Sequence, residues 1–242
     1  MAPFLLWSDR QQKVRWFMDQ YTEVRAQYPL AETFDFIGHS NGTYILASAL
    51  QKYRTLKVHD IYFAGSVVPQ RYPWSDLVRK QRVRRVRNVV ATNDWVVAIF
   101  PRVFEQIAEW RGRADNPELL DIGAAGFRGF QEAGLPDSGV HDITFASGTH
   151  STGVDLRVDG KRDVLIRFGR YGLDAEQDRM FDQVFGNAMT QWGFMDQLSN
   201  VSWLVWLAIV AIVVGGARIV WRWNRYLLAV YALIVVAILN SF

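Results

Sequence analysis

The sequence contains no cysteine, and it has only four histidines among 242 residues. The absence of cysteine excludes a disulfide framework, a cysteine-ligated zinc site and a cysteine nucleophile. It does not identify the compartment, because a chain without cysteine is stable in either redox environment. Any chemistry must come from other side chains, and no metal or other cofactor is expected.

A large net charge is also missing, since the formal value is +3 at pH 7. The one dense basic segment, residues 79–87, is RKQRVRRVR, and such a run could attract anionic lipid or nucleic acid. No aromatic residue that could stack on bases is interleaved, and a predicted strand follows at once. We therefore interpret the segment as a solvent-exposed helix end leading into a strand, with anionic membrane contact as the alternative and no nucleic-acid partner.

Charge is absent altogether from two runs near the carboxyl end, residues 197–217 and 226–242. A helix needs roughly 20 apolar residues to cross the bilayer core, with about 17 as the lower limit. A buried pair of core helices is the alternative, but a globular core rarely covers helices that are apolar on every face. The lipid bilayer is therefore an expected partner.

These runs divide the chain into a mixed domain, residues 1–196, and a two-pass transmembrane hairpin, residues 197–242. Aromatic residues cluster near the ends of the runs, where amphipathic rings prefer the headgroup zone: Trp203, Trp206, Trp221, Trp223 and Tyr226. Arginines between the runs favour a cytoplasmic loop, which would put the domain outside, yet no export signal follows Met1. The side of the membrane stays open.

Short apolar runs alternate with helical patterns in the first part. Strands are expected near 33–37, 59–64, 87–91 and 142–146, and helices near 8–28, 43–53, 74–81, 101–110 and 174–192. This alternation predicts an α/β fold with a mostly parallel sheet, right-handed crossovers and flanking helices. Residues 111–140, rich in Gly, Asp and Pro, are expected to be an irregular excursion.

Residues 33–44, TFDFIGHSNGTY, run from a strand pattern into a helix pattern through Gly38-His39-Ser40-Asn41-Gly42. This G-x-S-x-G order between strand and helix predicts a nucleophile elbow, in which Gly38 and Gly42 avoid Cβ collisions in a sharp turn. The Ser40 hydroxyl would stand at the carboxyl edge of the sheet. The Asn41 N–H, at the helix start, would be an oxyanion donor.

A serine hydroxyl needs a base to accept its proton and a carboxylate to orient that base. Asp94 follows the strand near 87–91 and His150 follows the strand near 142–146, so both should lie at the same sheet edge as Ser40. The other candidates rank lower, because they precede strands, lie in the excursion or sit inside the elbow: His39, His59, His141, Asp60, Asp115, Asp121 and Asp142.

The combination of GHSNG, NDWVV after one strand and GTHS after the next resembles the α/β-hydrolase family of serine esterases and lipases, over roughly residues 4–192. The resemblance implies Ser40 as nucleophile, Asp94 as acid, His150 as base and the Asn41 amide in the oxyanion hole. His39 would pack beside the serine. The family's glycine-rich loop, which supplies a second oxyanion donor from an earlier strand, has no counterpart before Ser40.

Two explanations for the missing loop are open: an amino-terminally shortened chain, which we favour, or a partner chain or second copy that covers the exposed edge of the elbow strand. Losing one oxyanion donor costs about a hundredfold or more in rate. The leading hypothesis is a membrane-anchored serine hydrolase acting on a small-molecule or lipid ester, with residues 111–140 as a cap over the pocket. The alternative is a non-catalytic membrane scaffold with a vestigial triad.

Overall fold

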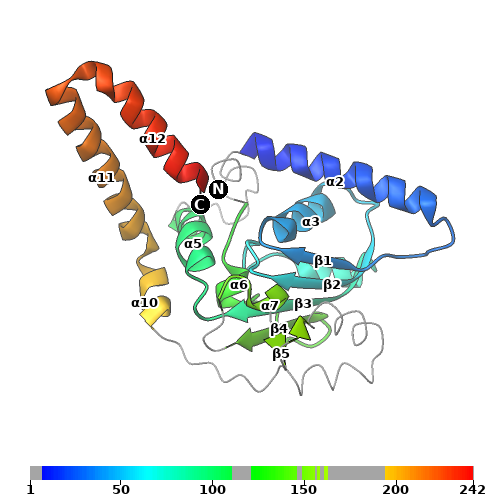
Figure 1. Cartoon of the computed structure of the whole chain (residues 1–242). Coiled ribbons are helices and arrows are strands. Elements are labelled where there is room, and N and C mark those ends of the chain that lie inside the picture. The colour runs from blue at the N-terminus through cyan, green and yellow to red at the C-terminus, as the bar shows by residue number, and fades with distance from the viewer. Residues whose placement is uncertain are drawn as a thin grey trace.

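A computed structural model of the chain describes residues 7–110, 121–145, 149–155, 157–158, 161–162 and 194–241. Figure 1 shows a twisted parallel sheet with helices packed against it and two long helices that project away from it. The predicted α/β arrangement with a parallel sheet and flanking helices is therefore confirmed.

The sheet contains four parallel strands in the order in which they occur along the chain. They are β1 (Phe36–His39), β2 (Val58–Ala64), β3 (Val83–Ala91) and β4 (Val140–Phe145). All four lie at or beside a predicted strand, although β1 is shifted toward the elbow and β3 starts four residues earlier than expected. Because the strands are parallel, their carboxyl ends share one edge of the sheet. Among the described strands β1 has β2 as its single neighbour, so the elbow strand lies at the side of the sheet as expected.

The helices of the domain join and cover these strands. They are α2 (Trp7–Gln27), α3 (Asn41–Lys52), α4 (Trp74–Arg79), α5 (Trp95–Trp110), α6 (Ala125–Arg128) and α7 (Thr152–Asp155). A short antiparallel pair, β5 (Arg157–Val158) and β6 (Lys161–Arg162), follows α7. The helix predicted near 174–192 lies outside the described residues.

Successive residues of β2 face opposite sides of the sheet. Phe63 belongs to the main hydrophobic core with Leu46 and Leu50 of α3. Tyr62 points the other way, where its hydroxyl donates to the Gly153 carbonyl of α7 (2.8 Å). Both faces of the strand are buried, which explains its continuous apolar pattern.

Several arginines of the basic run at residues 79–87 make contacts inside the domain or are buried in it. Arg82 donates hydrogen bonds to the carbonyls of Leu50 and Tyr53 (2.6 and 2.7 Å), where α3 ends. Arg85 and Arg87 are buried, at 8% and 2% exposure, so the interpretation of the run as solvent-exposed is wrong for them. Both side chains are buried because they lie on β3, a strand packed on both sides.

Residues 121–130 of the predicted excursion are largely buried. Residues 121–130 include apolar side chains that belong to the main core: Ile122, Ala124, Ala125, Phe127 and Phe130. The segment lies so close to residues 66–70 that a Cβ on Gly126 would overlap the Ser66 nitrogen, and Gly126 N–H donates to the Ser66 carbonyl (2.8 Å). This part of the excursion packs into the core. Residues 111–120, also part of the predicted cap, lie outside the described residues.

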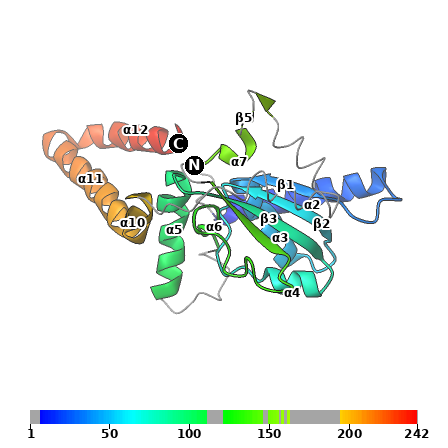
Figure 2. The same ribbon diagram turned by 90° about the horizontal axis from the view of Figure 1, so that it is seen from below.

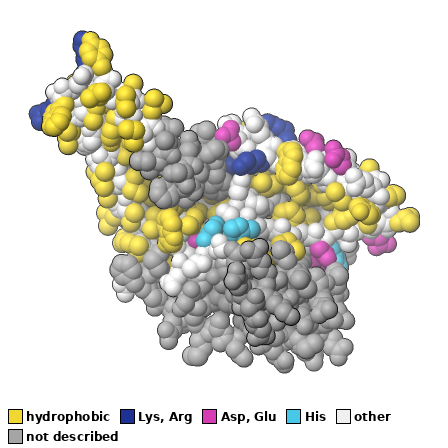
Figure 3. All heavy atoms as spheres, viewed as in Figure 1, with side chains coloured by type: hydrophobic (Ala, Val, Ile, Leu, Met, Phe, Trp, Pro, Cys, Tyr) yellow, Lys and Arg dark blue, Asp and Glu magenta, His cyan; other side chains and the backbone are white. Residues whose placement is uncertain are grey.

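The carboxyl-terminal part contains α10 (Phe194–Asn200), α11 (Ser202–Trp223), the 3-10 turn η1 (Arg225–Leu227) and α12 (Leu228–Ser241). The α11 helix is long and apolar enough to cross a membrane, and its apolar window is not buried against the described chain. Figure 3 shows hydrophobic side chains along the projecting helices, with basic side chains near their tip.

The predicted two-pass hairpin is not supported, because α11 is the one helix among the described residues that is both long enough and apolar enough to span a membrane. The helical path is interrupted at Asn224, whose backbone is extended (φ −160°, ψ 111°). The α12 helix has 14 residues, or about 21 Å at 1.5 Å per residue, against a hydrocarbon core of about 30 Å. It packs back on α11, where the Tyr231 hydroxyl donates to the Val213 carbonyl (2.9 Å).

Candidate active site

Ser40 lies in the turn between β1 and α3, as the motif predicts. Its backbone angles are φ 52° and ψ −119°, a conformation that residues with a Cβ rarely adopt. The turn is held from both sides, since Ser40 N–H donates to the Ala64 carbonyl (3.0 Å) and Thr43 N–H donates to the Ser40 carbonyl (3.0 Å). The strain is thus fixed by the neighbouring strand and the first turn of α3.

The two glycines of the motif differ in what they do. A Cβ on Gly38 would lie 2.7 Å from Phe36 Cε1 and 3.2 Å from the Thr43 nitrogen, so a side chain there collides with the turn. A Cβ on Gly42 would meet nothing within 4 Å. The prediction of a steric need for glycine therefore holds at position 38 and is wrong at position 42.

Asp94 and His150, which are far apart in sequence, meet at the carboxyl edge of the sheet. His150 Nδ1 lies 2.9 Å from Asp94 Oδ2. The Asp94 carboxylate is fully buried, and its other oxygen accepts the Val97 N–H (3.0 Å) in the first turn of α5. One carboxylate oxygen thus caps the amino end of α5, while the other faces the His150 imidazole.

The His150 ring lies beside the strand-to-helix turn that contains Ser40. A Cβ on Gly65, the residue after β2, would lie 2.7 Å from His150 Cε1, so the ring packs against bare backbone there. His39 Nε2 lies 3.1 Å from the His150 carbonyl oxygen, and the two rings are 4.9 Å apart between centroids. Within the described part of the chain, no hydrogen bond joins Ser40 Oγ to His150. Such bonds are often long in unliganded sites.

His39 and Gly65 were not expected to contact the base. His39 was predicted to pack beside the serine, and its side chain also contacts the backbone carbonyl of His150. Gly65 has no motif of its own. Its place directly after a parallel strand, at the same edge as Ser40 and Asp94, is the sequence signal that could have found it.

Asn41 is the first residue of α3 and Ser40 is its N-cap. The N–H groups of a first helical turn have no partner inside the helix, and they carry the positive end of the helix dipole. The Asn41 N–H belongs to this first turn, next to Ser40. Its role as an oxyanion donor stays a prediction.

Apart from His39, the lower-ranked candidates that the structure describes lie elsewhere. His141 of β4 is paired with Arg87 of β3, and His59 and Asp60 lie near the amino end of β2. Asp121 binds the buried Arg10 guanidinium (2.7 Å) and accepts from the Tyr44 hydroxyl. Burial raises the pKa of Asp121 against the opposing effect of these donors. Asp115 lies outside the described residues.

The Asp142 carboxylate makes hydrogen bonds that connect elements of the fold. Its half-buried carboxylate accepts from Asn88 Nδ2 (2.8 Å) and from the Phe130 N–H (2.8 Å). Burial raises its pKa to about 6, although both hydrogen bonds favour the charged form. The group links β3, β4 and the segment after α6.

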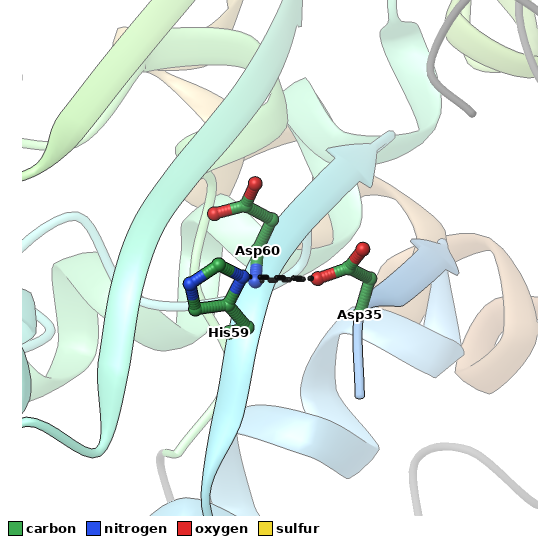
Figure 4. Close-up of side chains that lie close together, drawn as sticks. All are labelled: Asp35, His59 and Asp60. Carbon is green, nitrogen blue, oxygen red and sulfur yellow. Dashed lines mark hydrogen bonds and ion pairs between the residues drawn. The ribbon is translucent and has the colours of Figure 1, made fainter. Parts of the chain in front are cut away.

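One group of side chains has ligand atoms close enough to suggest a metal site. Figure 4 shows Asp35, His59 and Asp60, whose nearest oxygen and nitrogen atoms all lie within 4.8 Å of one another. Burial alone would raise the pKa of Asp60, but hydrogen bonds from Arg84 and Arg85 outweigh it and hold the pKa below its usual value. Because two guanidinium groups already neutralise this carboxylate, we assign no metal to the group.

No protein-family model, curated protein or solved structure matches this chain.

Proposed function

We propose that the chain is a serine hydrolase of the α/β-hydrolase type that cleaves a carboxylic ester through an acyl-enzyme. The observation that carries the proposal is the pair His150–Asp94 at 2.9 Å, beside a serine in a strained strand-to-helix turn. A nucleophile, a base and an orienting carboxylate at one sheet edge are the parts that acyl transfer needs.

In the proposed reaction, Ser40 Oγ attacks the ester carbonyl and its proton passes to His150 Nε2. Asp94 holds the ring through Nδ1 and stabilises the imidazolium. The Asn41 N–H donates to the oxyanion, after which the C–O bond breaks and the alcohol leaves with the proton from His150. Water then attacks the acyl-enzyme, with His150 as base, and releases the acid and free Ser40.

We further propose that α11 anchors this domain in a membrane. The support is its length of 22 residues, its apolar composition and the exposure of large side chains along it. A core helix of a soluble domain would be covered, whereas α11 contacts the domain only near its base and leaves large apolar side chains exposed along the rest of its length.

The test is covalent labelling of the full-length chain by a fluorophosphonate probe, with Ser40→Ala as the matched control. Labelling of the wild type and not of Ser40→Ala is the expected result. The alternative, a non-catalytic scaffold, predicts that neither protein is labelled. Equal labelling of both proteins would assign the reactivity to another serine and contradict the role of Ser40.

A further inference from the structure

The helix that carries the triad acid at its start also holds the base of α11. In Figures 1 and 2, α5 lies between the sheet and the helices α10 and α11. The Trp206 indole donates to the Ile99 carbonyl (3.3 Å), and its ring meets Phe100 edge to face at 5.3 Å. Trp203 packs on Trp110 in the same way, at 5.8 Å. Both halves of α5 thus contact the first one and a half turns of α11.

A buried polar cluster fixes this contact. Ser202 donates to Gln106 Oε1 (2.7 Å), and Gln106 Nε2 donates to the Asn200 carbonyl (2.9 Å). Arg128, from α6, donates to the Ser199 hydroxyl (2.9 Å). Gln106, Ser199 and Ser202 are all nearly inaccessible to solvent. Since buried polar groups are costly to separate from their partners, the base of α11 is held rigidly on the domain.

The level of α5 relative to a bilayer follows from this attachment. The 22 residues of α11 extend about 33 Å, close to the hydrocarbon thickness of about 30 Å, so its first turns lie at one interface. Trp203 and Trp206 are the ring type that prefers that zone. Because α5 contacts these turns, α5 lies at headgroup level, with its start beside Asp94.

An exposed tryptophan continues this aromatic surface to the triad. Trp95 directly follows Asp94, is 46% exposed, and has its ring centroid 6.1 Å from that of Phe100. Trp95, Phe100 and Trp206 therefore form a strip of rings that runs from the base of α11 to the residue next to the triad acid. We call these three residues the aromatic strip.

From this strip we infer that the Ser40 site takes its acyl group from an ester lodged in the bilayer, whose chain reaches the site along Trp95. The inference rests on the proposed function and names its substrate class, a membrane-resident acyl ester. A site at headgroup level receives such a molecule without drawing its chain through water, which would cost about 0.8 kcal/mol for each CH₂ exposed.

The placement can be measured without any catalysis, because the chain has no cysteine and single-cysteine variants can be labelled cleanly. A nitroxide on Trp95→Cys is compared with one on Leu135→Cys, a similarly exposed apolar position before β4. In phosphatidylcholine vesicles, the first label should collide more with lipid-soluble oxygen and the second more with a water-soluble nickel chelate. Equal nickel access at both positions would overturn the inference.

The substrate class is tested with two fluorophosphonates that share a reactive group. One carries a short water-soluble chain, and the other a hexadecyl chain dissolved in the vesicles. The variant Trp95→Ala should slow labelling by the hexadecyl probe about fivefold, as expected for loss of an aromatic contact, and leave the short probe within about twofold. Leu135→Ala should change neither.

The outcomes separate the two proposals. If neither probe labels wild-type Ser40, the hydrolase function fails, and this inference fails with it, whatever the nitroxide depth. If the short probe reacts normally and Trp95→Ala changes neither rate, only the membrane-substrate inference fails. If both rates fall equally, Trp95 acts by positioning Asp94, and the inference is again overturned.

Discussion

The backbone strain at Ser40 leads to a test that does not depend on turnover. The substitution is Ser40→Gly, which removes the Cβ that makes φ 52° and ψ −119° costly. A residue held in such a sparsely populated region costs about 1–3 kcal/mol. Glycine loses about 0.5–1 kcal/mol more backbone entropy on folding, so the net gain in the free energy of unfolding should be roughly 0.5–2 kcal/mol.

The assay is thermal unfolding of the full-length protein in detergent. For a protein of about this size, 1 kcal/mol shifts Tm by roughly 2–4 °C, so Ser40→Gly should melt a few degrees above the wild type. Ser40→Ala is the matched control, because it also removes the hydroxyl but keeps the Cβ and hence the strain. Ser48→Gly, inside α3, is the opposite control and should lower Tm.

The reasoning is refuted if Ser40→Gly melts at or below Ser40→Ala. That result would mean that the turn relaxes once the side chain changes, or that the elbow conformation carries no stored energy. Ser40→Gly should also resist fluorophosphonate labelling, because it lacks the hydroxyl of the proposed nucleophile.

Three further predictions concern the residues around the site. Gly38→Ala should lower the free energy of unfolding by about 1–3 kcal/mol through overpacking, whereas Gly42→Ala should leave it unchanged or raise it by up to about 1 kcal/mol in urea titrations. If both variants behave alike, the turn is not as described. Asp94→Asn should fold but lose about 10³–10⁴ in kcat on an activated ester, as expected when the base loses its orienting carboxylate, and a loss under tenfold would contradict the role. The pKa of Asp142 is raised from 3.8 to about 6, so its protonated form contributes stability that is complete below pH 3.8 and is lost as the pH rises through 6. Wild type should therefore lose Tm relative to Asp142→Asn between these pH values, and parallel Tm curves would exclude a raised pKa.

The sheet and the elbow could be predicted because their signals are local. Short apolar runs separated by helical patterns define the four strands, and G-x-S-x-G between a strand and a helix defines the turn at Ser40. The meeting of Asp94 and His150 followed from one rule, that parallel strands end at one edge. Each of these predictions used positions close together in sequence, or a rule of topology that needs no side-chain detail.

Features that depend on side-chain partners could not be predicted. The start of α5 was expected at Pro101, a residue favoured in a first helical turn, but the helix begins six residues earlier, at Trp95, where Asp94 caps it. Arg87 is buried because β3 is covered on both sides, which its basic sequence conceals. The docking of α11 uses Gln106 and Ser202, ordinary polar residues whose partners lie more than 90 positions away.

The order of the strands has a consequence for synthesis. Each strand pairs with the one translated just before it, so the sheet can grow one strand at a time as the chain leaves the ribosome. Asp94 and His150 follow β3 and β4, so their 2.9 Å contact can form only after all four strands of this sheet have been made. The apolar α11 is synthesised later still, after α5, the helix that holds its base.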